Sequence, residues 1–365
     1  IYSKNSQFQD ALKYYEDALA VSNYKINTIE KIIYLYTKQG KYADAINFIK
    51  RFKDKIDIVE YKPIFIRLSK LYTIVGLLKD NALLTEKLET IYPEDTTIIA
   101  LKLDAYLQTN QLHLCFSDIQ KLQKQKQTEA LANLYLAKYK KFINEPNEAK
   151  KILEKIMTQY NNQDKYIAEV YKEYAALLIA EEDYNTALGY LEKAKTQLTE
   201  DYELYYFIGQ CQLNLYNNIA ALDAFNQCLS LNFLHLSARY NIVKIMMDDL
   251  KLYKEALMHI NYLIAEFPEN SEYPKLKGDC CLKLENYGEA ISAYKKSIEI
   301  DPLSQFSEEA FLAVGTIYKK LNNKEAALNE YLTAINYFSD NWIFYFNAAN
   351  ILDDLNRLTE AEDLF

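Results

Sequence analysis

The stretch that decides the fold is residues 271–304, SEYPKLKGDCCLKLENYGEAISAYKKSIEIDPLS. Its apolar residues recur at helical spacing in two runs, which predicts helices over about 272–284 and 287–300. Glu285 and Asn286 separate the two runs. Pro302 ends the second run, because proline cannot continue a helix and disfavours a helical conformation in the residue before it. The stretch is therefore predicted to be a helix–turn–helix hairpin of 34 residues.

The same hairpin recurs along the chain with a step of 34 residues. The four clearest copies begin at Ala168, Tyr202, Ser237 and Ser271, with one extra residue, Leu236, between the second and the third. A small residue fills the twentieth place of each copy: Ala187, Ala221, Ala256 and Ala290. A bulky apolar or aromatic residue follows four places later: Leu191, Phe225, Ile260 and Tyr294. A short period of this kind indicates a repeat array in which each unit packs on its neighbours.

Small residues also mark where helices of the array cross closely. Glycine stands in the eighth place of three units, at Gly209, Gly278 and Gly315. There we expect two helices to approach so closely that a side chain would hold them apart. Cys115 fills the alanine place of its unit and Cys228 fills another small place, so packing explains both thiols.

This spacing resembles the tetratricopeptide repeat over essentially the whole chain. The pattern of that family has a small residue in the first helix, then alanine and an aromatic residue in the second helix, and a closing proline. Gly278, Ala290, Tyr294 and Pro302 match it in the unit quoted above. The resemblance implies an all-α fold, a right-handed α-solenoid superhelix of about ten helix–turn–helix repeats.

The phase of the repeats divides the chain into four parts. Residues 1–23 are expected to be the second helix of a partial repeat, 26–163 the N-terminal and more degenerate units, 168–304 the regular units, and 308–365 the C-terminal units, with the last one truncated. The segment 60–95 contains Ala82 and Pro93, but no single frame satisfies both of its helices. Pro146 is placed at the start of a second helix, where proline is tolerated. Because both ends fall inside a repeat, we expect the protein to continue beyond them.

Charge is unevenly distributed over the chain, whose net charge is −9 at pH 7. Residues 1–201 carry 29 Lys and Arg against 28 Asp and Glu, whereas residues 202–365 carry 13 against 23. A nucleic-acid interface needs clustered Lys and Arg, so this balance argues against nucleic acid as a partner. No apolar run approaches the roughly 18 residues that a membrane span needs.

The residues that usually carry catalysis or bind metals are few and scattered. His113, His235 and His259 fall in different units, and no His or Cys pair has metal-ligand spacing. We expect His259 to face solvent. No two glycines have the spacing of a phosphate-binding loop. The sequence therefore predicts no enzyme, no cofactor and no metal site.

The five cysteines are odd in number and contain no C-x-x-C pair. Free thiols suit a reducing compartment, which favours the cytoplasm.

In the resembled family, the first helix of each unit lines a concave groove that holds a protein or peptide. The resemblance therefore implies a set of groove residues of mixed aromatic, amide and charged character: Tyr34, Tyr135, Lys138, Lys172, Tyr206, Phe207, Gln210, Asn241, Asp248, Lys275, Asp279, Phe346, Asn347, Asn350 and Asp353. Such a groove suits an extended or helical peptide with apolar anchors and basic residues. Repulsion between like charges disfavours acidic tails.

Two groove chemistries of the family are not matched. Members that bind the acidic tails of heat-shock chaperones use Lys and Asn in one unit, Asn in the next, then Lys and Arg, and no three successive units show that set. Members fused to a protein-glycosylating enzyme carry a ladder of Asn in the sixth place, where this chain has only Asn347.

The leading hypothesis is a non-catalytic scaffold or adaptor within a larger assembly. One alternative is the substrate-docking arm of a larger enzyme. Others are a component of a bacterial envelope or secretion machinery and a component of a eukaryotic ciliary or cell-cycle assembly. These alternatives stay open at this point.

Overall fold

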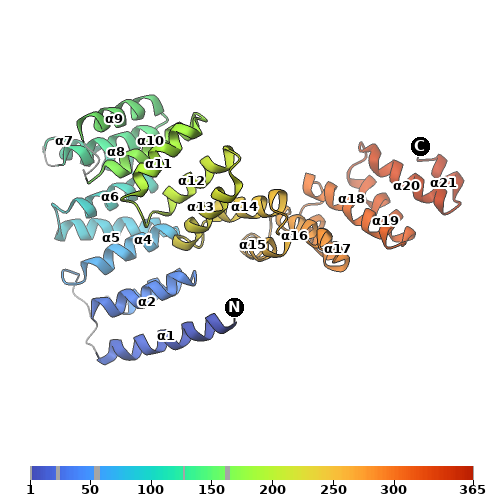
Figure 1. Ribbon diagram of the computed structural model, residues 1–365, viewed down its shortest axis with the longest axis horizontal. Coiled ribbons are helices and arrows are strands. Elements are labelled where there is room, and N and C mark those ends of the chain that lie inside the picture. The colour runs from blue at the N-terminus through green and yellow to red at the C-terminus, as the bar shows by residue number, and fades with distance from the viewer. Residues whose placement is uncertain (1, 22–24, 53–57, 126–127, 161–164, 365) are drawn as a thin grey trace. The chain divides into compact units, whose positions relative to one another are not determined.

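The computed structural model describes residues 2–21, 25–52, 58–125, 128–160 and 165–364 (Figure 1). Throughout these ranges the secondary structure is helical, without a strand. Consecutive helices pack on one another in sequence order. The chain is an all-α repeat superhelix, as predicted. It separates into two compact units, Ile1–His235 (unit 1) and Leu236–Phe365 (unit 2).

Each repeat is a hairpin of two helices, and α1 (Tyr2–Val21) precedes the first of them. The first helices are α2 (Ile26–Lys38), α4 (Lys62–Ile74), α6 (Thr96–Gln108), α8 (Glu129–Phe142), α10 (Ile167–Ala180), α12 (Tyr202–Asn214), α14 (Leu236–Lys244) with the π-helix η1 (Ile245–Asp249), α16 (Glu272–Lys283), α18 (Gln305–Lys320) and α20 (Trp342–Asp354). The second helices are α3 (Tyr42–Phe52), α5 (Leu78–Ile91), α7 (Leu112–Gln123), α9 (Pro146–Gln159), α11 (Tyr184–Lys195), α13 (Asn218–Leu231), α15 (Tyr253–Glu266), α17 (Tyr287–Ile300), α19 (Lys324–Tyr337) and α21 (Leu358–Glu362).

The turn inside every hairpin has one residue in the left-handed region. These residues are Gly40, Gly76, Asn110, Asn144, Glu182, Tyr216, Lys251, Glu285, Asn322 and Asn356. A left-handed residue after a helix lets the next backbone N–H groups bond back to the carbonyls of its last turn. At Glu285, for example, the Glu285 N–H bonds to the Leu282 carbonyl and the Asn286 N–H to the Cys281 carbonyl. These turns mark the repeat phase directly.

Aromatic rings cover the glycines of the eighth place, which confirms the predicted close approach. A Cβ added to Gly278 would lie 2.6 Å from the ring of Tyr294, and one added to Gly209 would lie 2.5 Å from the ring of Phe225. Tyr331 covers Gly315 in the same way. The second helix of each of these hairpins therefore lies directly on the backbone of the first.

Segment 60–95, in which no single frame of the sequence pattern fits both helices, forms an ordinary hairpin of α4 and α5. Counted from the turn residue Gly76, the glycine, alanine and aromatic places hold Ser69, Asn81 and Thr85. All three are buried. Ser69 Oγ donates to Asn81 Oδ1 at 2.6 Å, and Asn81 Nδ2 donates to Thr73 Oγ1 at 3.1 Å. The polar groups of this core form hydrogen bonds with one another. The hairpin therefore keeps its fold although the apolar pattern of the other repeats is absent.

From the sequence, one extra residue, Leu236, is expected between the second and third of the four clearest copies. In the structure this residue does not lie between two repeats. Helix α14 begins at Leu236 itself, and the additional residue is taken up by η1 at the end of this first helix. There the Leu250 N–H bonds to the Ile245 carbonyl at 3.0 Å, five residues back. A π-turn inserts one residue into a helix without breaking it.

Candidate functional site

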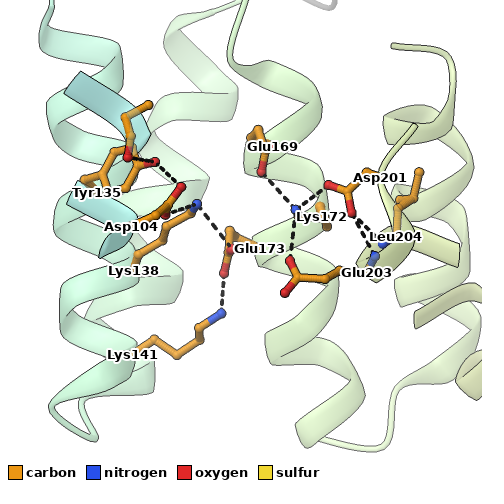
Figure 2. A network of polar contacts seen from close by, with 11 residues as sticks. Asp104, Tyr135, Lys138, Lys141, Glu169, Lys172, Glu173, Asp201, Glu203 and Leu204 are labelled. Carbon is orange, nitrogen blue, oxygen red and sulfur yellow. Dashed lines mark hydrogen bonds and ion pairs between the residues drawn. The ribbon is translucent and has the colours of Figure 1, made fainter. Parts of the chain in front are cut away.

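Four first helices of unit 1, α6, α8, α10 and α12, are joined by a network of charges that ranges from the buried Lys172 to the exposed Lys141 and Glu203 (Figure 2). At one end, the Tyr135 hydroxyl lies 2.9 Å from the Ala100 carbonyl and 2.8 Å from Asp104 Oδ2. Lys138 Nζ donates to Asp104 Oδ1 at 3.2 Å. Burial and the neighbouring Asp104 carboxylate raise the pKa of Tyr135, so it stays a neutral phenol.

Glu173 on α10 receives two lysines of α8. Lys141 is hydrogen-bonded to Glu173, and Lys138 Nζ lies 3.9 Å from Glu173 Oε1. Burial alone would raise the pKa of Glu173, but the lysines around it outweigh burial and lower this pKa to about 2. Burial alone would lower the pKa of Lys138, and its carboxylate neighbours raise it instead. Both groups are therefore charged at neutral pH.

Lys172 makes the corresponding junction between α10 and α12. Only 4% of this lysine is exposed. Its Nζ lies 2.6 Å from Asp201 Oδ2, 3.2 Å from Glu169 Oε2 and 3.4 Å from Glu203 Oε2. The other Asp201 oxygen accepts the N–H groups of Glu203 and Leu204, which caps the start of α12. One carboxylate thus fixes the helix start and binds the buried lysine.

Within this network, carboxylates outnumber lysines. Lys138, Lys141 and Lys172 are held by the carboxylates already named, Asp104, Glu169, Glu173, Asp201 and Glu203. Tyr135 and Lys172, both predicted as groove residues, are buried. A buried ion pair adds little to the net free energy of folding, but removing one of its partners leaves an unpaired buried charge and is costly. Such pairs therefore favour the helix packing in which both partners meet.

Aromatic and amide groups of α12 lie beside this network. Gln210 Nε2 donates to the Tyr206 hydroxyl at 3.2 Å. The ring of Tyr206 lies 6.1 Å from that of Phe207 and 4.5 Å from that of His235. These side chains are half-buried, and burial lowers the pKa of His235. Tyr206, Phe207 and Gln210 therefore form one contiguous patch.

Tyr34 belongs to the N-terminal part of unit 1. Its side chain is half exposed, and Lys38 Nζ lies 5.5 Å from the centre of its ring.

In unit 2 the predicted groove residues form a second, separate set of contacts. Lys275 Nζ lies 3.1 Å from Asp279 Oδ2 and also pairs with Glu309. The Tyr294 hydroxyl donates to Asp279 Oδ1 at 2.8 Å. Asp248 is exposed and pairs with Lys244 at 3.0 Å, and Asn241 is half-buried on α14.

Helix α20 carries an exposed aromatic pair. Trp342 is 68% exposed and Phe346 is 47% exposed, with ring centres 6.0 Å apart and edge to face. Asn347 accepts a hydrogen bond from Lys319 Nζ at 3.4 Å. Asn350 is half-buried and Asp353 is exposed on the same helix. The sequence reasoning missed Trp342, because it considered only the interior places of each first helix.

The expectation for His259 is wrong. This side chain is half-buried, and its Nδ1 lies 3.4 Å from Arg239 Nη1. Burial and the positive charge of Arg239 lower the pKa of His259 to about 4. It is a neutral packing residue of α15.

Within the described parts of the chain, no group of three or more His, Cys, Asp or Glu side chains is arranged to hold a metal ion. Over the same residues, no helix has the length and apolar character that crossing a membrane requires.

Comparison with known proteins agrees with the repeat geometry. Two family models, each described as tetratricopeptide repeat, match the chain: one over residues 202–233 and 276–302, the other over residues 312–365. No curated protein matches in sequence.

Two solved structures share the fold. The C-terminal part of a TPR repeat-containing protein from Cytophaga hutchinsonii is 15% identical, with a TM-score of 0.54 over 67% of this chain and 97% of its own. The Cut9 and Hcn1 hetero-tetramer of APC/C is 16% identical, with a TM-score of 0.52 over 96% of this chain and 74% of its own. The chain contains tetratricopeptide repeats. Proteins of this class are generally non-catalytic scaffolds for other proteins.

Proposed function

We propose that this protein is a non-catalytic scaffold or adaptor that holds a partner protein on the first-helix faces of its repeats, as one subunit of a larger assembly. The observation that carries this proposal is the chemistry of those faces. In unit 1 the lysines are held by a larger number of carboxylates, next to the patch of Tyr206 and Phe207. In unit 2 the exposed rings of Trp342 and Phe346 stand on an acidic background.

These features support a partner segment that is extended or helical, with apolar anchors flanked by Lys or Arg. Aromatic side chains bury a large area at an interface and are frequent among the residues that dominate binding. The surplus of carboxylates attracts basic residues, which accelerates association more than it strengthens binding. Acidic tails and nucleic acids are disfavoured by the same charges.

A direct test uses the purified chain and synthetic peptides. Peptides that combine Leu or Phe anchors with Lys and Arg should bind, and the same peptides with Glu in place of Lys and Arg should not. Binding should weaken as salt rises, because the ionic part of the attraction is screened. The proposal is abandoned if neither peptide class binds and the chain also captures no protein from its native lysate.

Variants then locate the surface. Phe207→Ala in unit 1, or Trp342→Ala with Phe346→Ala in unit 2, should lower the affinity of a bound peptide about tenfold or more. Tyr216→Ala is the matched control, since this ring is 89% exposed but lies in a turn instead of on a first-helix face. Equal losses for the control and the face variants would rule out these faces as the binding surface.

The five cysteines support a reducing compartment such as the cytoplasm. All of them are free and buried. Free thiols of this kind are typical of proteins that are not exposed to an oxidising environment.

A further inference from the structure

We propose that unit 1 is closed on itself by a clasp that opens and closes without unfolding a repeat, so that a partner bound to unit 1 can favour one of the two states. The clasp is defined as the contact between the α2–α3 turn, residues 38–42, and the end of α13 with the turn after it, residues 230–234. The existence of the clasp does not depend on the proposed function. Only the effect of the clasp on a bound partner depends on the proposed function.

The centre of the clasp is a hydrogen bond between residues 191 positions apart. The backbone N–H of Phe233 donates to the Tyr42 hydroxyl at 2.7 Å. Tyr42 is the first residue of α3 and only 2% exposed. Its hydroxyl accepts this backbone N–H of the short turn after α13.

The surfaces of the two turns also fit together at the clasp. Gly40 has a φ of +70°, and a Cβ added to it would lie 2.5 Å from the Phe233 ring. Phe233 and Leu234 pack against the hydrophobic core of the N-terminal repeats, which includes Tyr42, Ala45 and Ile46. The ring of Phe233 therefore rests on a backbone position that only glycine leaves open.

A third contact comes from Lys38 at the end of α2. Its Nζ donates to the Ser230 carbonyl at 3.3 Å. Ser230 lies in the last turn of α13, where carbonyls have no partner within the helix and the helix dipole favours a positive charge. This contact is exposed to solvent, so it adds little to the strength of the clasp.

Nothing in the packing of a repeat array requires such a contact. Each repeat is stabilised by its neighbours, so the first and last hairpins of a row have no need to meet. Here they meet through a few side chains with one buried tyrosine. A contact of this size can open without unfolding any repeat, because the hairpins on both sides keep their own cores.

The clasp consequently sets two states of unit 1. In the closed state the α2–α3 turn and the end of α13 are in contact. In the open state they separate, while the hairpins on both sides stay folded. A partner that binds the open state better would shift the population toward it, by no more than its difference in affinity for the two states.

The test measures the distance across the clasp by pulsed electron double resonance. Spin labels are placed at Asp44→Cys on α3 and Gln227→Cys on α13, both at exposed positions. The native thiols are buried, and burial raises the pKa of Cys115, Cys211, Cys228 and Cys280 to about 12, so labelling is selective. The unmodified clasp should give one short, narrow distance distribution.

Three variants should open the clasp. Gly40→Ala places a methyl group against Phe233, and Phe233→Ala removes the ring. Tyr42→Phe removes only the hydroxyl and should raise the open-to-closed ratio roughly fivefold, as expected for the loss of about one hydrogen bond. Each variant should add a longer and broader distance component while the helical circular dichroism is unchanged.

Gly76→Ala is the matched control. Gly76 has nearly the same backbone conformation, with a φ of +75°, but nothing lies within 4 Å of the Cβ it would gain. It should strain its turn equally and leave the labelled distance unchanged. A broad distribution in the unmodified protein overturns the proposal, as do identical distributions in all variants. Opening by Gly76→Ala as strong as that by Gly40→Ala also overturns it, since backbone strain alone would then explain the effect.

Discussion

The hydroxyl of Tyr294 donates a 2.8 Å hydrogen bond to Asp279, and the ring of the same residue covers Gly278. The hydrogen bond holds the ring in place, so the ring cannot turn aside to make room for a larger residue at Gly278. Helices α16 and α17 are thereby fixed at their closest approach.

We expect Gly278→Ala to destabilise the protein by about 1–3 kcal/mol, because the added methyl group overpacks this crossing. Gly189→Ala is the control: it lies within α11 with nothing within 4 Å of its new Cβ. That change should stabilise the helix by roughly 0.5–1 kcal/mol. Urea unfolding followed by circular dichroism measures both, and equal effects would contradict the packing described here.

The left-handed turn residue Tyr216 offers a stabilising change. Its φ is 61°, a conformation that costs a residue with a side chain more than it costs glycine. Since the ring is 89% exposed, Tyr216→Gly should raise the free energy of unfolding by about 1 kcal/mol. Gln227→Gly, on the exposed side of α13, should instead lower it by roughly 0.5 kcal/mol, because glycine is the poorer helix former. A fall in stability for Tyr216→Gly would show that its ring packs on a neighbour.

The polar core of the α4–α5 hairpin should respond as a connected network. Asn81→Ala leaves Ser69 without its hydrogen-bond acceptor and should cost about 1–3 kcal/mol. The double variant with Ser69→Ala should cost less than the sum of the two single variants, because the second change removes the group that the first left unpaired. Strict additivity in thermal unfolding would mean that the hydrogen bond does not form in solution.

Acid should weaken the charged network through Glu173. Its pKa is lowered from 4.5 to about 2, so its ionised form stabilises the folded state above pH 4.5. That contribution, roughly 3 kcal/mol at neutral pH, is lost as the pH falls from 4.5 toward 2. Unfolding curves at pH 7 and pH 3 should therefore differ less for Glu173→Gln than for the unmodified protein. Glu192→Gln, at an exposed pair with Lys195, should keep the full difference.

The repeat step, the hairpin helices and the glycine–aromatic crossings could be predicted from the sequence because they are local or recur at a fixed spacing. Gly209, Gly278 and Gly315 stand in the same place of three units, and each is covered by an aromatic ring. The α4–α5 hairpin could not be aligned, because Ser69, Asn81 and Thr85 replace the residues that define the pattern.

The candidate site was less accessible to sequence reasoning. Lys172 was predicted to face the groove, yet carboxylates of α10 and α12 bury it. The bonds of this network join residues about thirty positions apart, whose pairing depends on how neighbouring hairpins stack. The place of a residue in its repeat predicts which face of the helix its side chain lies on. It does not predict which charged side chains on that face pair with one another.

The π-turn of η1 has a consequence for how this array tolerates changes in length. One residue inserted into a plain helix rotates everything after it by about 100° around the helix axis and would turn Ala256 away from the core. Here the insertion is confined to a single widened turn, and Ala256 remains fully buried as Ala221 is. A repeat of this array can therefore gain one residue and keep its fold. What the repeats share is the set of side chains that pack between helices, and the number of residues between those side chains can vary by one.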